Sequence, residues 1–118
     1  MIFAALLLAA ADAPPVTGFY RSNQIEIGAA LELDGDGHFQ YQLDYGAVSE
    51  SAEGNWLSDG STVYLTATRM EGEFKQPKFN RQALKIEGDR LLLNRYDTVI
   101  RFEREDLPAP ADNKKWEE

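Results

Sequence analysis

The residues best suited to chemistry stand close together in the segment LELDGDGHFQYQLDY, which covers residues 31–45. Asp34, Asp36 and His38, the chain's only histidine, fall within five positions of one another. Carboxylate and imidazole groups at this spacing are typical of a calcium loop or of part of a zinc site. Apolar residues alternate on both sides of the segment, so a turn between two strands is the other interpretation.

The calcium interpretation fails at the last ligand. A calcium loop of the EF-hand kind needs acids at positions 1, 3 and 5, glycine at 6 and a bidentate acid at 12. Starting at Glu32 puts two aspartates and a glycine at positions 3, 5 and 6, but position 12 is Leu43, and the acid Asp44 comes one place late. Zinc usually draws more nitrogen or sulfur than His38 alone can supply. We therefore predict a hairpin turn that holds no metal, with glycine taking the positive φ.

Other catalytic groups are scarce in this sequence. The chain has no cysteine, which removes disulfides, thiolate metal sites, a thiol nucleophile and a lipid-modified anchor. A serine triad would have to use His38, yet there is no Gly-x-Ser-x-Gly elbow, and phosphate-binding glycine loops are also missing. Among 20 acidic residues, nothing singles out an acid and base pair. We expect no enzyme, no metal and no cofactor.

Period-two alternation runs from about residue 17 to residue 105 and predicts an all-β fold. A helical turn is allowed in 46–53, and 71–78 is predicted to be the longest loop. Turn signals recur every ten residues or so, which is typical of a sandwich or barrel. We predict a single antiparallel meander that closes into a small barrel of about eight strands. The predicted strands are 17–22, 25–33, 39–45, 54–57, 62–69, 79–86, 90–95 and 98–104.

One face of every strand must fill the interior of such a barrel. Tyrosine or tryptophan on that face needs a hydrogen-bond partner or a wet cavity for its polar end. Two interpretations follow, a filled core with tyrosine hydroxyls at its rim, which we favour, or a small ligand cavity. The ligand contacts predicted for the cavity are Tyr41, Tyr45, Trp56 and Tyr64. The predicted inward set is Phe39, Tyr41, Leu43, Tyr45, Trp56, Val63, Leu65, Leu84, Ile86, Leu91, Leu93, Ile100 and Phe102.

The N-terminus indicates an exported protein. The apolar stretch 2–11 is too short for a membrane span and has the length of the apolar centre of a signal peptide, although no Lys or Arg precedes it. We predict a signal peptide at 1–11, a spacer at 12–16, a barrel domain at 17–105 and a mobile tail at 106–118. The predicted location is the periplasm or the exterior of the cell.

Net charge limits the classes of partner. A formal charge of −8 argues against binding the phosphate backbone of nucleic acid. With 43% hydrophobic and 27% charged residues, the composition is ordinary for a folded soluble domain, and we expect no stable membrane insertion.

Four segments in order, GFY, LELDGDGHFQY, YGAVSESAEGNW and STVYLTA, resemble small exported bacterial barrels of the lipocalin-like kind. That group includes the N-terminal barrel of the copper-homeostasis lipoprotein NlpE, and the resemblance covers roughly residues 18–65. It implies a meandering antiparallel barrel in the cell envelope with a binding or sensing role. Both the lipidation cysteine and the Cys-x-x-Cys pair of the NlpE type are missing, so metal handling and lipid anchoring do not carry over.

Two functions from different classes agree with these features. The first is an exported, non-enzymatic barrel that binds a small apolar or amphipathic ligand. The second is a solid-core module that engages an envelope protein. A cavity of roughly 300 Å³ or more favours the first, and a filled core with an exposed apolar patch favours the second.

Overall fold

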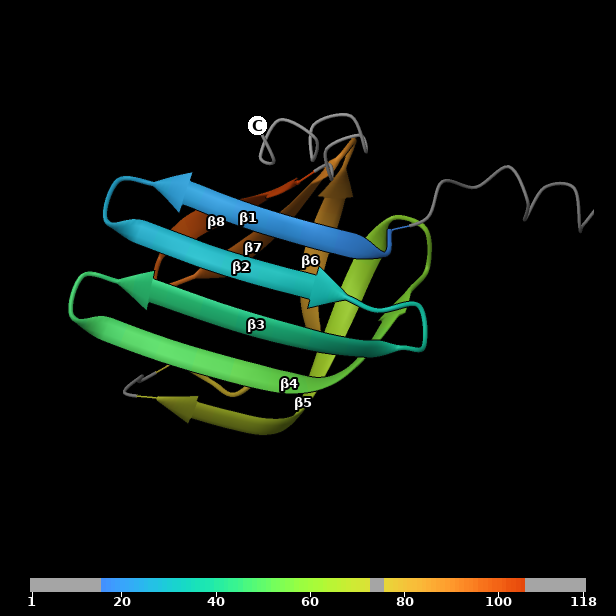
Figure 1. Cartoon of the computed structure of the whole chain (residues 1–118), viewed down its shortest axis with the longest axis horizontal. Helices are drawn as coiled ribbons and strands as arrows, with labels where there is room; N and C mark the ends of the chain where they lie inside the picture. The colour runs from blue at the N-terminus through green and yellow to red at the C-terminus, as the bar shows by residue number, and fades with distance from the viewer. Residues whose placement is uncertain (1–15, 73–75, 106–118) are drawn as a thin grey trace, which may run out of the picture.

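In a computed structural model of the chain, which describes residues 16–72 and 76–105, eight strands form one closed barrel (Figure 1). Each strand pairs antiparallel with the next in sequence, and β8 returns to pair with β1. This confirms the predicted all-β fold and the antiparallel meander that closes on itself. The strands are β1 (Gly18–Gln24), β2 (Ile27–Leu33), β3 (His38–Tyr45), β4 (Val48–Ser58), β5 (Thr62–Gly72), β6 (Gln82–Glu87), β7 (Arg90–Arg95) and β8 (Thr98–Arg104).

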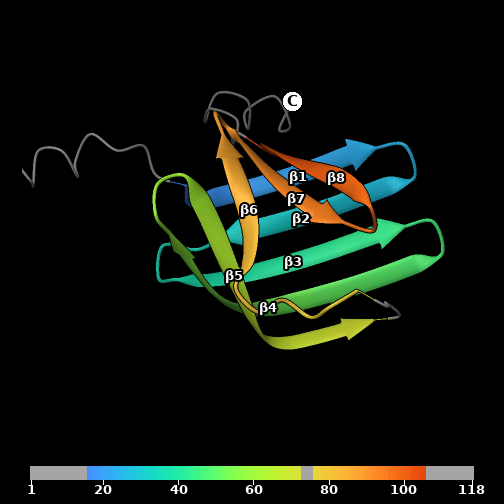
Figure 2. The ribbon, with the colours of Figure 1, turned by 180° about the vertical axis from the view of Figure 1, so that it is seen from behind.

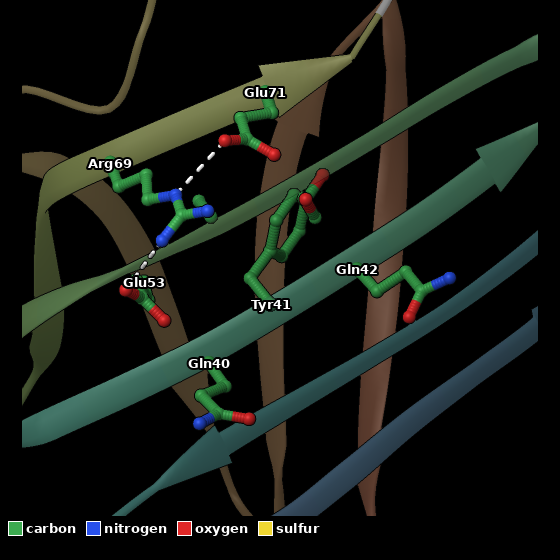
Figure 3. A pocket seen from close by; sticks show the side chains of 8 residues that line it. Gln40, Tyr41, Gln42, Glu53, Arg69 and Glu71 are labelled. Atoms are coloured by element: carbon green, nitrogen blue, oxygen red, sulfur yellow. Dashed lines mark hydrogen bonds and ion pairs between the residues drawn. The ribbon is translucent and has the colours of Figure 1, made fainter.

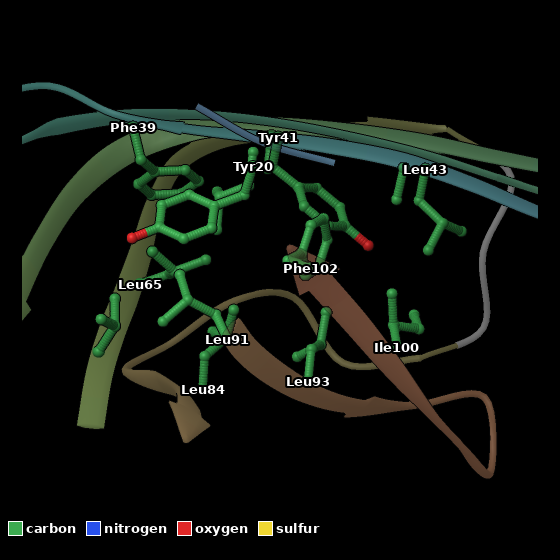
Figure 4. Close-up of a cluster of buried hydrophobic side chains, with 14 of the residues drawn as sticks. Tyr20, Phe39, Tyr41, Leu43, Leu65, Leu84, Leu91, Leu93, Ile100 and Phe102 are labelled. Carbon is green, nitrogen blue, oxygen red and sulfur yellow. The ribbon is translucent and has the colours of Figure 1, made fainter. Parts of the chain in front are cut away.

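The interior is filled by side chains that alternate with exposed ones along each strand. In Figure 4, the labelled core side chains of opposite walls point toward one another. The predicted inward set is confirmed, although Tyr45, Trp56 and Ile86 are only partly buried. The buried core consists of Tyr20, Ile27, Ala29, Leu31, Leu33, Phe39, Tyr41, Leu43, Ala52, Val63, Leu65, Phe79, Leu84, Leu91, Leu93, Ile100 and Phe102.

The helical turn allowed in 46–53 is wrong, because β4 runs through that segment. Glu50, Ala52 and Gly54 face inward there, while the residues between them are exposed. The alternation is regular, but its inward positions hold an acid and two small residues instead of large apolar ones. Apolar periodicity alone therefore could not reveal the strand.

Two other boundaries also differ from the prediction. The longest connection spans 73–81 rather than 71–78, since β5 continues to Gly72 and β6 begins at Gln82. Ile25 is not in the second strand: it lies in the turn between β1 and β2, next to Glu26 at φ 65°, and is 90% exposed. The predicted signal peptide at 1–11 and tail at 106–118 lie outside the described residues.

A bulge divides the pairing between β4 and β5 into two parts. The register between them shifts at Glu53 and Gly54. A Cβ atom on Gly54 would overlap the carbonyl oxygen of Thr66 and come within 2.8 Å of the Cα of Ala67, so only glycine allows this approach. Bulges increase local twist, and Figure 2 shows β5 bending away from β6 along its course.

In the part of the chain that the structure describes, no helix has the length and apolarity to cross a membrane.

Candidate ligand-binding site at the barrel mouth

A hollow of about 720 Å³ opens at one end of the barrel, which we call the mouth. The turns β2–β3, β4–β5 and β6–β7 surround it. Its lining includes two buried core residues, Tyr20 and Leu91, together with the more exposed Trp56, Leu57 and Ile86. The volume lies within the range of about 300–1,000 Å³ that is usual for small-molecule sites.

The β2–β3 turn positions the indole of Trp56. Trp56 Nε1 donates a hydrogen bond to the carbonyl oxygen of Asp34 at 2.9 Å, and the Trp56 backbone N–H donates to the carbonyl oxygen of Gly37 at 2.9 Å. Both N–H groups of the residue are thus hydrogen-bonded to the neighbouring hairpin. What the partly buried ring presents to the hollow is therefore apolar surface, as an apolar ligand would need.

The predicted hairpin turn is confirmed at Asp34 to Gly37. The Asp34 N–H donates to the carbonyl oxygen of His38 at 2.8 Å, and Gly37 adopts φ +94°. Asp36 Oδ1 accepts the backbone N–H of His38 at 3.2 Å and lies 3.1 Å from its Nδ1, and these hydrogen bonds lower the Asp36 pKa. Within residues 16–72 and 76–105, no three acidic or histidine side chains come together as a metal site needs.

Arg104 of β8 ties the start of β1 to the side of the mouth. Its Nη1 donates to the carbonyl oxygen of Thr17 at 2.7 Å, and its Nη2 donates to the Tyr20 hydroxyl at 2.9 Å. The Tyr20 hydroxyl in turn donates to the carbonyl oxygen of Val16 at 2.7 Å. Burial raises the Tyr20 pKa, an effect that the nearby Arg104 charge partly opposes. The Arg104 guanidinium therefore serves as a brace between two strand ends.

The other end of the barrel holds a buried carboxylate, and we call it the closed end. Glu50 of β4 is 2% exposed and Arg95 of β7 is 4% exposed. Glu50 Oε2 accepts from Arg95 Nε and from the Tyr41 hydroxyl, both at 2.6 Å. Glu50 Oε1 accepts from Arg95 Nη2 at 2.9 Å and from the Tyr96 hydroxyl at 2.6 Å. Each carboxylate oxygen therefore has two donors, and Arg95 Nη1 also donates to the carbonyl oxygen of Pro77 at 2.9 Å.

These contacts set the protonation states of the closed end. Burial raises the Glu50 pKa, but the hydrogen bonds from Arg95, Tyr41 and Tyr96 outweigh it and hold the pKa below its ordinary value. Burial, followed by the hydrogen bond to Glu50, raises the pKa of Tyr41 well above its ordinary value and that of Tyr96 to about 12. At neutral pH the cluster is a carboxylate and a guanidinium held by two neutral phenols. Because each of its carboxylate oxygens accepts two hydrogen bonds, Glu50 has a structural role.

Another, smaller hollow of about 290 Å³ lies on the outer surface of β3, β4 and β5 (Figure 3). Its lining is mostly polar and includes Gln40, Gln42 and Glu53. Arg69 spans it, with Nε 2.9 Å from Glu71 Oε2 and Nη1 3.9 Å from Glu53 Oε2. All three charged side chains are more than half exposed. This open polar surface offers less to a small apolar ligand than the mouth does.

The four predicted ligand contacts do not lie in one site. Tyr41 belongs to the closed end, and Tyr45 packs edge-on against Tyr96 beside it, with ring centroids 5.7 Å apart. Trp56 lies at the mouth. Tyr64 lies between inward-facing neighbours on the outer side of β5, 5.0 Å below the Arg81 guanidinium. Of the four, the structure therefore places Trp56 alone in the lining of the hollow at the mouth.

Several residues of the mouth and of the closed end were not identified as site residues from the sequence. Parity did place Ile86 and Leu91 inside, and only their position at one end connects them to Trp56. Leu57 has outward parity, and its place in the lining depends on the β4–β5 turn. No local pattern pointed to Glu50 and Arg95, which lie 45 positions apart in the sequence.

Comparison of the chain with family models, curated proteins and solved structures gives no match. The function must therefore be argued from the two ends of the barrel. The closed end has its polar groups paired, whereas the mouth leaves apolar surface in contact with an open hollow.

Proposed function

We propose that the protein is an exported, non-enzymatic barrel that binds a small apolar or amphipathic ligand at its mouth. The observation that carries this proposal is the hollow of about 720 Å³ with the partly exposed Trp56 ring in its lining. Burial of apolar surface is the driving force, at about 25 cal/mol for each Å² removed from water. Export is supported by the apolar stretch 2–11. Binding is favoured over catalysis because the sequence has no recognisable motif that pairs a nucleophile with a general base.

The charges in the lining favour one orientation of the ligand. Asp36 and Asp89 lie on two of the surrounding turns, whereas Tyr20 and Leu91 belong to the core. Among the described residues that line the hollow, the one cation is Arg104, and it already donates to backbone and phenol oxygens. An apolar chain would therefore point toward the core, with a neutral or cationic head near the acidic turns.

Tryptophan fluorescence tests the proposal directly. In a Trp116→Phe background, Trp56 is the only tryptophan, so its emission reports on the mouth. Dodecyl trimethylammonium, dodecyl maltoside and dodecyl sulfate, each below its micelle concentration, would be titrated into the protein. We expect a saturable shift of the emission with the cationic and neutral probes and a weaker response to the anionic one.

Two matched variants show where the probe binds. Leu57→Ser removes an apolar side chain that is 66% exposed at the mouth, and Val99→Ser removes one that is 38% exposed on β8 and outside the lining of the hollow. We expect Leu57→Ser to weaken binding and Val99→Ser to leave it unchanged. A flat titration with all three probes, or equal effects of the two variants, would contradict the proposal.

A protein-interaction module is the second candidate, and one observation favours it. Ile25 stands at the tip of the β1–β2 turn with 90% of its surface exposed, where turns usually carry polar residues or glycine. A single exposed apolar residue is common on soluble proteins, so this feature weighs less than the hollow. If no probe binds the mouth, an envelope protein partner becomes the better proposal.

A further inference from the structure

The second half of β5 is a sheet edge. Residues Thr68 to Gly72 continue β5 beyond Thr62–Leu65, the part that pairs with β6. On their other side, β5 pairs with β4 as far as Gly72. Among the described residues, no strand covers the β6 side of Thr68 to Gly72, and Figure 2 shows this part of β5 at the border of the sheet. Unpaired backbone N–H and C=O groups at such an edge can accept another strand.

The returning chain covers the inner face of this edge instead of pairing along it. Ala67 N–H donates to the carbonyl oxygen of Phe79 at 3.0 Å, just before the edge begins. Phe79 is 2% exposed in the core, and its own N–H donates to Met70 Sδ at 3.4 Å. Phe79 therefore lies in the interior behind the edge, and beyond Ala67 the described residues show no backbone hydrogen bond between the returning chain and this part of β5.

Another short seam in the barrel shows what a covered edge looks like. β1 and β8 share only two paired positions. The side chain of Gln24 bridges the rest, since its Oε1 accepts from the Arg101 N–H at 2.8 Å and its Nε2 donates to the carbonyl oxygen of Val99 at 3.4 Å. Along Thr68 to Gly72, the side-chain bond of this kind in the described residues is the one from the Phe79 N–H to Met70 Sδ, and among those residues no bond from Arg69 or Glu71 reaches the returning chain.

We propose that two copies of this chain pair through this edge, with antiparallel β5 strands and a two-fold axis at Met70. A two-fold axis perpendicular to the sheet makes each edge residue face its symmetry equivalent or a partner at equal distance from the axis. Centred on Met70, it pairs all five residues from Thr68 to Gly72 and places Arg69 opposite Glu71 of the second copy, twice.

Charge selects this register over its neighbours. A centre at Arg69 would set two arginines opposite each other, and a centre at Glu71 would set two glutamates opposite each other. Directly opposed like charges destabilise a strand pair, and opposite charges stabilise it. Arg69 and Glu71 are 66% and 63% exposed and now pair within one copy, so both can reach across the edge.

The contact is small and independent of the proposed ligand site. Five residues on each side fall short of a standard interface of about 800 Å² per partner, so the dimer should be weak and concentration dependent. The edge comes at the end of β5, whereas the mouth is formed where β5 begins. Dimerisation would leave both mouths open.

Sedimentation equilibrium tests the proposal from about 10 μM to about 1 mM protein, a range suited to weak association. We expect the average mass to rise from monomer toward dimer, and to rise less at high salt because the paired charges are exposed. Arg69→Glu should keep the protein monomeric over the whole range. Combining it with Glu71→Arg should restore association, since the charges again oppose each other across the axis.

The control is Arg101→Glu, the same charge reversal at an exposed position on β8. It should associate like the unmodified protein, and circular dichroism should show that every variant is folded. A monomer at all concentrations would overturn the proposal. So would a dimer that Arg69→Glu does not weaken, or a double variant that stays monomeric while folded.

Discussion

The two ends of the barrel are held together by different contacts. β4 contributes to both, with Glu50 inside the closed end and Trp56 at the mouth. At the closed end, a carboxylate with four donors draws β3, β4 and β7 together. At the mouth, the Trp56 indole makes one hydrogen bond to a turn, and hydrogen bonds from Arg104 and Tyr20 hold the start of β1.

This difference in contacts predicts which end contributes more to stability and which end binds a ligand. A buried ion pair is intolerant of change in either partner, because the remaining charge has no water to solvate it. A partly exposed apolar hollow tolerates change better and can exchange water for a ligand. We therefore expect substitutions at the closed end to act on folding and those at the mouth to act on ligand binding.

The largest effect is expected for Glu50→Ala. It leaves Arg95 buried without its carboxylate, and breaking a buried pair in this way destabilises a protein by about 3–5 kcal/mol. Urea unfolding followed by circular dichroism measures the change. Glu53→Ala, an exposed acid on the same strand, should change the free energy of unfolding by less than about 0.5 kcal/mol. Equal changes in the free energy of unfolding for the two variants would mean that the Glu50–Arg95 pair does not stabilise the closed end.

Trp56→Ala should have a smaller effect on folding. Fully buried Trp→Ala changes cost about 3–5 kcal/mol, and we expect about 2 kcal/mol here because the ring is only partly buried. The variant should also lose ligand affinity, which calorimetry with dodecyl trimethylammonium can follow without a tryptophan signal. A full core-sized loss of stability with unchanged affinity would assign Trp56 to the core alone.

Tyr96→Phe sharpens the account of the closed end. It removes one of the four donors to Glu50 and keeps the ring that packs on Tyr45. A hydrogen bond to a charged group contributes about 1.5–3 kcal/mol when buried, and the partial exposure of Tyr96 brings the expected loss to about 1 kcal/mol. Probe binding at the mouth should not change. Reduced affinity in this variant would show that the two ends are coupled.

The pH dependence should be the mildest difference between the ends. The folded pKa of Glu50 is lowered, so its contribution to stability is present above the unfolded pKa of about 4.5 and is lost as pH falls through the folded pKa. The raised pKa of Tyr96 works in the opposite direction, with stability lost as pH rises from about 10 to about 12. Melting temperatures from pH 2 to 12 should show both losses, and the acid loss should shrink in Glu50→Gln. An unchanged acid limb in that variant would assign the loss to other carboxylates.

How much could be predicted from the sequence differs between the elements. Where most inward positions hold large apolar residues, as in Arg90–Arg95 and Thr98–Arg104, the strands were located to the residue. In β4, Glu50 occupies an inward position, and the first half of the strand was missed for that reason. For the site, parity placed Trp56 inside, but the predicted ligand contacts grouped it with Tyr41, Tyr45 and Tyr64, which lie elsewhere.

The sequence by itself determined the alternation, the Asp-Gly turn and therefore the meander of short strands. These are local properties, because side-chain direction alternates with every residue of a strand and glycine at a turn needs only its own backbone freedom. Only the tertiary structure decided which end of the barrel closed. The Glu50 carboxylate and the Arg95 guanidinium meet because barrel closure brings β4 and β7 to the same depth, and the hollow forms because three turns converge near Trp56. Both depend on distances across the barrel, which no periodicity within a single strand can specify.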